Sequence, residues 1–151
     1  MKLAEALQER ADLNRKIEQL RSRITANALV QEGEEPAEDP NELLKELESA
    51  CDRLIELVAA INRTNTETKA DGKTLTEIIA EKDVLSVKAA CYRDLVSSAS
   101  DRVQRYTRTE IKILSTVNVK EIQKKADRIS QRIRQLDNAL QAANWTTELM
   151  E

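Results

Sequence analysis

The sequence contains no histidine and no phenylalanine, and it has only two glycines, two prolines and two cysteines among 151 residues. Histidine is the commonest general base near neutral pH and the commonest zinc ligand, so its absence excludes serine or cysteine triads of the usual kind. Two isolated glycines cannot build a glycine-rich phosphate loop. Cys51 and Cys91 are too few for a disulfide framework or a zinc site. We therefore expect no cofactor, no metal and no catalytic residue that can be named.

Long apolar runs are missing as well. No stretch approaches the roughly 18 apolar residues of a membrane span. The N-terminal "MKLAEALQER" is charged within its first five residues and has no apolar core, unlike a secretory signal. We therefore expect a cytoplasmic protein without a membrane partner.

Charged residues make up 34% of the chain and aromatic residues only 2%. This composition is typical of long helices that pack through Leu, Ile and Ala. The length suits one domain, and the few Gly and Pro residues leave few places to break a helix. We predict a single helical-bundle domain over residues 1–151.

Apolar residues at three-four spacing predict a first helix from about Lys2 to Val30. An acidic loop follows at 31–41; it contains both prolines and is expected to be solvated. Asn41 is a candidate N-cap for the second helix. That helix carries a sustained heptad seam, typical of a coiled coil, at Leu44, Leu47, Cys51, Leu54, Val58 and Ile61.

The second half of the chain predicts two further helices. A turn at Asp71-Gly72 precedes a capping-box pattern formed by Thr74 and Glu77, which opens a helix reaching about Tyr106. Asn118 is a candidate cap for the last helix. The loops are short compared with the helices, so we expect an elongated antiparallel bundle of about four long helices, which is a mainly α fold.

Residues 108–119 do not follow the helical pattern. They are rich in β-branched side chains, which favour strands, and predict a short β element after the third helix. A lone strand leaves its backbone groups unpaired. The segment can fold as a hairpin about Ser115 and Thr116, form an irregular linker, or pair with another subunit, which we favour. Arg105, Arg108 and Lys112 would then meet acidic helices across the interface.

Candidate functional residues lie near the predicted ends of the helices. The second helix ends with the polar run Asn62, Arg63, Thr64 and Asn65. Asn65 falls four residues after the last seam position, where it either fixes the register of an assembly or belongs to a solvated helix end. Trp145, the single tryptophan, is expected to pack against a neighbouring helix or subunit.

The charge is unevenly distributed. Residues 102–134 contain ten basic and three acidic residues, a net charge of +7, so the remainder of the chain carries −10. A basic helix can follow nucleic-acid phosphates. It can equally pair with acidic helices of the same assembly.

Several segments together resemble a known family: "MKLAEALQERADL", "VQEGEEPAEDP", "INRTN", "DGKTLTE" followed by "EKDVL", "RYTRTEIK" and "NWTTEL". The family consists of small bacterial helical proteins of unknown function, often called septicolysin. The resemblance covers the whole chain and implies a mostly helical cytoplasmic protein, with no catalytic residue to carry over. The name suggests a pore-forming toxin, but the sequence has no secretion signal and no aromatic-rich or lipid-facing segment.

Three functions remain open. The first is a structural or interaction protein that self-assembles into a homo-oligomer, because several helices carry apolar residues wider than one seam. The second is a nucleic-acid-binding bundle that uses the basic stretch 102–134. The third, least favoured, is an enzyme with a polar site around Asn62, Arg63, Arg108 and Glu110.

Overall fold

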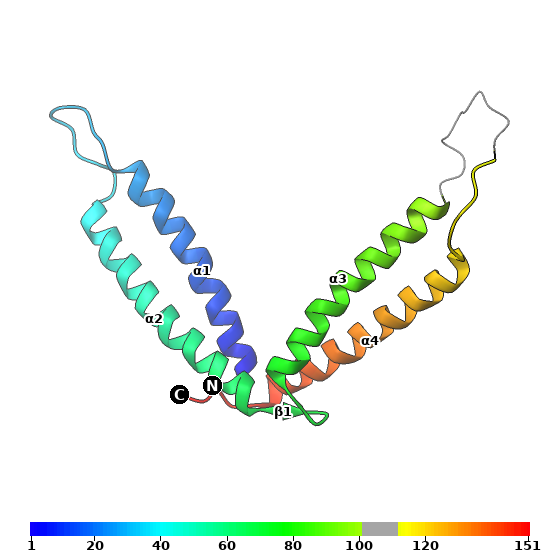
Figure 1. Cartoon of the computed structure of the whole chain (residues 1–151). Helices are drawn as coiled ribbons and strands as arrows, with labels where there is room; N and C mark the ends of the chain where they lie inside the picture. Colours follow the sequence, from blue (N-terminus) through cyan, green and yellow to red (C-terminus); the bar gives the residue numbers. More distant parts are fainter. Residues whose placement is uncertain (101–111) are drawn as a thin grey trace. The chain divides into compact units, whose positions relative to one another are not determined.

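The computed structural model describes residues 1–100 and 112–151 of the chain (Figure 1). Within these residues the fold is mainly α, as predicted, and it includes one small hairpin. The elements in chain order are α1 (Leu3–Ala26), α2 (Pro40–Glu67), β1 (Lys69–Ala70), β2 (Lys73–Thr74), α3 (Leu75–Ser100) and α4 (Val119–Thr146). None of the described helices combines the length and the hydropathy that a membrane-crossing segment requires.

The chain divides into two compact units. The first consists of Met1–Lys69 and Ala142–Glu151, and the second consists of Ala70–Gln141. The expectation of a single domain over residues 1–151 stays a prediction.

In the first unit α1 and α2 pack antiparallel. Arg53 of α2 donates two hydrogen bonds to Glu9 near the start of α1, at 2.7 and 2.9 Å, and Arg23 near the end of α1 pairs with Glu38 just before α2. Between them lies a core of Leu, Ile and Ala side chains: Leu3, Ala6, Leu20, Leu43, Ala50, Leu57, Ala60 and Ile61.

The buried face of α2 differs from the predicted seam at every second position. Leu47, Leu54 and Ile61 belong to both. At the other three positions the buried residues are Leu43, Ala50 and Leu57. Each lies one position before the predicted residue, which is Leu44, Cys51 or Val58. Three of the six positions shift by one residue, or about 100°, and three are shared, so the buried face is centred about 50° from the predicted one.

The boundaries of α1 and α2 also differ from the prediction. α1 ends at Ala26 rather than Val30, because the Asn27 side chain donates to the Arg23 carbonyl at 2.8 Å and closes the last turn. α2 is capped by Asp39, not by Asn41. The Asp39 carboxylate accepts the backbone N–H of Asn41 at 2.9 Å, and proline follows at the first helical position, where its missing N–H costs nothing.

The β element lies between α2 and α3, not after α3. Its two strands are joined by Asp71 and Gly72, whose φ angles of 51° and 81° lie in the left-handed region. Asp-Gly at two positive-φ positions favours a tight hairpin. Of the predicted strand-like segment 108–119, the described residues 112–118 contain no strand, Val119 begins α4, and the remainder lies outside the described residues.

The second unit confirms both predicted helix starts. Thr74 and Glu77 form the capping box of α3: the Glu77 carboxylate accepts the Thr74 N–H at 2.7 Å, and the Thr74 hydroxyl accepts the Glu77 N–H at 3.2 Å. Asn118 caps α4 by accepting the Glu121 N–H at 3.2 Å. The two helices bury Leu75, Ile78, Ala89, Ala126, Leu136 and Leu140.

Candidate functional site

The polar run at the end of α2 surrounds one buried hydroxyl. Thr64 is fully buried, and its Oγ1 donates to the Ala60 carbonyl at 2.8 Å and accepts the backbone N–H of Met150 at 2.9 Å. The Arg63 guanidinium donates to the Met150 carbonyl at 3.4 Å. Two of the four predicted residues therefore hold the C-terminal segment of the chain.

The same C-terminal segment also pairs with the beginning of the chain. Leu3 N–H donates to the Thr147 carbonyl at 2.9 Å, and Leu149 N–H donates to the Met1 carbonyl at 2.8 Å, around an antiparallel bridge between Lys2 and Glu148. We call these paired residues, 1–3 and 147–150, the terminal clasp. Figure 1 shows the two chain ends beside each other in the first unit.

Glu148 adds an ion pair to the terminal clasp. Its carboxylate accepts from Lys2 Nζ at 2.5 Å and from the Met1 amino group at 3.3 Å. The hydrogen bond from Lys2, followed by that from Met1, lowers the pKa of the Glu148 carboxyl below its usual value.

The other residues predicted from the ends of the helices do not join this cluster. Asn62 is exposed, and its carbonyl accepts the Thr66 hydroxyl at 2.9 Å. Asn65 is half-buried, one position beyond the buried seam position of Thr64. Trp145 is 61% exposed, and its packing against a neighbouring helix or subunit stays a prediction.

A hollow of about 480 Å³ lies beside the terminal clasp, lined in part by Arg53, Glu56, Arg63 and Leu149. The Arg53 guanidinium forms ion pairs with Glu9 and Glu56. The hollow therefore joins apolar surface to an arginine, Arg63, that forms no ion pair within the described residues.

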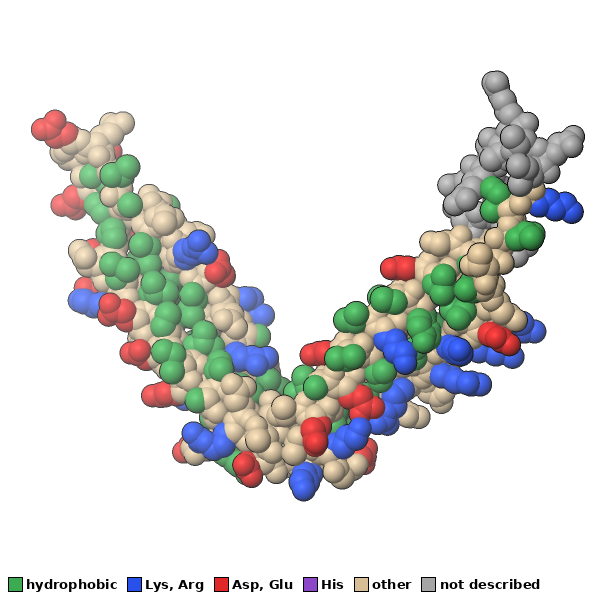
Figure 2. Space-filling model, in the orientation of Figure 1, with side chains coloured by type: hydrophobic (Ala, Val, Ile, Leu, Met, Phe, Trp, Pro, Cys, Tyr) green, Lys and Arg blue, Asp and Glu red, His purple; other side chains and the backbone are tan. Residues whose placement is uncertain are grey.

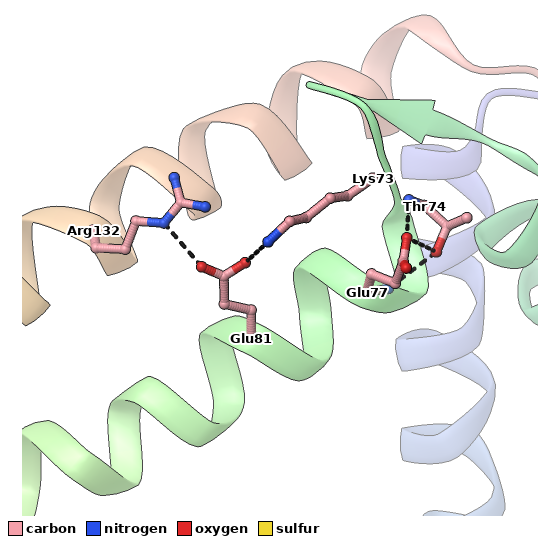
Figure 3. A network of polar contacts seen from close by, with 5 residues as sticks. All are labelled: Lys73, Thr74, Glu77, Glu81 and Arg132. Atoms are coloured by element: carbon pink, nitrogen blue, oxygen red, sulfur yellow. Dashed lines mark hydrogen bonds and ion pairs between the residues drawn. The ribbon is translucent and has the colours of Figure 1, made fainter.

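The second unit contains a polar network centred on Glu81 of α3 (Figure 3). One carboxylate oxygen accepts from Lys73 Nζ of β2 at 2.5 Å, and the other accepts from Arg132 Nε of α4 at 3.0 Å. These hydrogen bonds, that of Lys73 first, lower the pKa of Glu81. Lys82 adds a parallel contact to Asp137 of α4 at 2.9 Å. The network joins the hairpin, α3 and α4, and both Glu81 oxygens are occupied by it.

The opposite side of α3 carries a second apolar row that was not predicted from the sequence. Val84 and Val87 are 67% and 66% exposed, and Leu95 is 38% exposed. Figure 2 shows hydrophobic side chains along this helix. We call the row the outer stripe; its members, all exposed, are Ala80, Val84, Val87, Cys91 and Leu95. The signal was available in the sequence, because these residues also repeat at spacings of three and four.

The basic stretch is only partly described. Arg105, Arg108 and Glu110 lie outside the described residues, so their predicted roles stay predictions, and Lys112 is exposed. Figure 2 shows Lys and Arg side chains gathered along α4. Arg132 is held by Glu81, whereas five exposed cations form no ion pair within the described residues: Lys120, Lys124, Lys125, Arg128 and Arg134.

Comparisons with known proteins agree with this fold and assign no activity. A crystal structure described as that of a functionally unknown conserved protein from Corynebacterium diphtheriae is similar to this chain, with 43% sequence identity, 99% of each chain covered and a TM-score of 0.92. No curated protein matches the chain. Neither description carries the name septicolysin. A family model described as "Family of unknown function (DUF6847)" matches residues 10–149, so the chain belongs to that family of unknown function.

Proposed function

We propose that the protein is a helical interaction module that self-assembles through the outer stripe of α3. The observation that carries this proposal is the exposure of Val84 and Val87, at 67% and 66%, in the middle of a regular apolar row. An exposed apolar row at spacings of three and four residues is the pattern by which one helix packs against another.

The two sides of α3 also support self-assembly. One side packs Leu75, Ile78 and Ala89 into the second unit, and the other presents the outer stripe. A helix that is apolar on both sides is normally covered on both sides. A helix from another molecule at the outer stripe would complete that cover.

The area of the outer stripe sets the expected affinity of the self-association. From Ala80 to Leu95 it runs for about 22 Å, and across a helix about 10 Å wide this is roughly 220 Å². A standard stable interface buries about 800 Å² on each partner. We therefore expect a reversible assembly with a dissociation constant in the high micromolar range.

Light scattering across protein concentrations tests the proposal, because mass action makes a weak oligomer concentration-dependent. We expect the mass to rise above the 17.1 kDa of one chain between roughly 10 and 500 µM. The Val84→Lys/Val87→Lys variant should stay at the monomer mass. A constant monomer mass for the unsubstituted chain would refute self-assembly.

A matched control is available on the same helix. Ser86 and Ser97 are exposed and lie outside the outer stripe, so Ser86→Lys/Ser97→Lys makes an equal change in charge. This control should associate like the unsubstituted chain. Equal loss of association in both variants would indicate a general charge effect and would count against the stripe.

Polyanion binding along α4 is the second candidate. The exposed cations of α4 without an ion pair in the described residues, such as Lys124, Lys125 and Arg128, favour it. Fluorescence anisotropy with a labelled DNA duplex at low salt should then show binding that weakens steeply as salt rises. Lys124→Glu/Arg128→Glu should weaken it, and Lys16→Glu, an exposed site on α1, should not. No anisotropy change at low salt would exclude this candidate.

A further inference from the structure

The outer stripe contains a partial internal repeat. Ala80 and Val84 recur as Cys91 and Leu95, each eleven residues later, while the position eleven residues after Val87 is the small polar Ser98. Eleven residues at about 100° per residue make three turns plus about 20°, so the stripe hardly drifts around α3. A surface that runs nearly straight along a helix suits a second straight helix along its whole length.

The stripe has differently charged edges. At about 100° per residue, Asp83 and Asp94 lie along one edge and Lys88 lies along the other. All three are exposed and form no ion pair within the described residues. Lys88 Nζ lies 5.8 Å from the centroid of the Tyr92 ring on its own helix. The edge charges are therefore available to a helix that covers the stripe.

These charges distinguish the two ways of pairing two copies of α3. In an antiparallel pair each edge lies against the same edge of the second copy, so aspartates meet aspartates and Lys88 approaches Lys88. In a parallel pair in register the unlike edges meet. Each Asp83 then lies beside Lys88 of the second copy, and the symmetry makes this contact twice. Charges at the edges of paired helices select partner and orientation in this way.

We infer that the occupant of the outer stripe is α3 of a second copy of this chain, parallel and in register. The inference rests on the proposed function and adds the partner, its orientation and the contacts that select it. It places Cys91 opposite Cys91 of the second copy, and Val84 opposite Val84. In the antiparallel alternative, with the two stripes fully overlapped, Cys91 faces Val84.

The position of Cys91 makes the orientation measurable. The first probe is the full-length Cys51→Ser variant, which keeps Cys91 as its only thiol. The second carries Cys51→Ser, Cys91→Ser and Val84→Cys, so its only thiol is at position 84. Diamide takes two protons and two electrons from a facing pair of thiols, leaving one disulfide and the reduced hydrazine. Non-reducing gels follow the rate at concentrations where light scattering detects association.

The parallel arrangement predicts rapid disulfide formation by each probe on its own. Cross-linking only when the two probes are mixed would overturn it in favour of an antiparallel pair. A dimer by light scattering in which neither probe cross-links would overturn the inference and leave self-assembly intact. A monomer at every concentration would overturn both.

A charge exchange supplies an independent readout. Asp83→Lys places Lys beside Lys88 of the second copy and should raise the dimer dissociation constant by roughly 2- to 30-fold, the range expected for two exposed ion pairs. The double variant Asp83→Lys/Lys88→Asp should restore association. Failure of the double variant to restore it would contradict the Asp83–Lys88 contact.

Discussion

Thr64 occupies a core position with a polar side chain, and its hydroxyl has a partner on each side. Replacement by Val preserves shape and leaves the Met150 N–H without its acceptor. We expect Thr64→Val to lower the free energy of unfolding by about 1 to 2 kcal/mol in urea titrations.

Thr66 provides the control for this prediction. It is exposed on the same helix, and its hydroxyl donates only to the local carbonyl of Asn62. Thr66→Val should change stability by less than about 0.5 kcal/mol. Equal effects of the two substitutions would show that the bond between Thr64 and the terminal clasp is not a source of stability.

Glu81 carries a pH dependence whose sign follows from its partners. Lys73 and Arg132 lower its pKa in the folded state, so its contribution to stability is present above the unfolded pKa. That contribution is lost as pH falls through the lowered folded value. In Glu81→Gln the melting temperature should therefore fall less between about pH 7 and pH 3 than in the unsubstituted chain. Glu35→Gln removes a carboxylate of the exposed loop before α2 and is the control; an effect of equal size there would refute the assignment.

The local sequence could identify Arg63 and Thr64 as candidate functional residues, but it could not identify Met150 as the residue to which both bond. The polar run at 62–65 suggested a special helix end, and heptad spacing favoured Asn65 as the residue that sets the register. The structure buries Thr64 instead, because the seam passes through that position. Its acceptor role depends on Met150, 86 residues away, and a single sequence carries no pattern that joins such distant positions.

At the scale of the helix, α2 illustrates the limit of periodicity. The pairs Leu43-Leu44, Ala50-Cys51 and Leu57-Val58 each consist of two neighbouring apolar residues. The three-four pattern therefore fits two overlapping helix faces, which differ in the member of each pair that they include. Counting apolar residues cannot choose between these faces. Packing against α1 determines which face is buried, and it buries the first member of each pair.

This choice can be tested on α2 itself. Leu57 is 1% exposed and Ile55 is 67% exposed. Leu57→Ala should cost about 2 to 5 kcal/mol, because it removes buried methyl groups and leaves a cavity. Ile55→Ala should cost less than about 1 kcal/mol. Chemical denaturation of both variants checks the prediction, and similar losses would mean that the buried face of α2 is wrongly assigned.

The hairpin was partly predictable from its turn. Asp71-Gly72 is a strong signal for a two-residue hairpin turn, although it was interpreted only as a turn before the third helix. The strands on either side are two residues long, too short to show alternation. The segment 108–119 was chosen instead because β-branched residues are abundant there. Composition favours strands only where a partner strand exists.

At the scale of the whole molecule, the class of fold followed from composition, whereas the division into two compact units did not. Abundant charge, scarce aromatics and few helix breakers predicted long antiparallel helices, and the short loops predicted their order. The division into two compact units has no such signal. It depends on which helix faces meet, and the α2 seam shows that these are ambiguous by one residue.

The meeting of the two chain ends leads to a further expectation. Deletion of residues 148–151 removes the bonds of Leu149 to Met1 and of Met150 to Thr64, together with the Glu148 ion pairs. We expect a loss of about 2 kcal/mol, close to the sum of two hydrogen bonds. Urea unfolding measures it. Deletion of Glu151 alone should leave the midpoint unchanged, and an unchanged midpoint for the longer deletion would contradict the stabilising role of the terminal clasp.

The exposed position of Trp145 has a consequence for optical measurements. The chain has one tryptophan, and 61% of its surface is already in water in the folded state. Indole emission moves to longer wavelength when the ring enters water, so unfolding should shift the emission maximum only slightly, while circular dichroism should record the full loss of helix. A shift to shorter wavelength on raising the protein concentration would instead report that a second molecule covers the indole. Emission wavelength in this protein is therefore a poor measure of folding and a sensitive measure of contact at the end of α4.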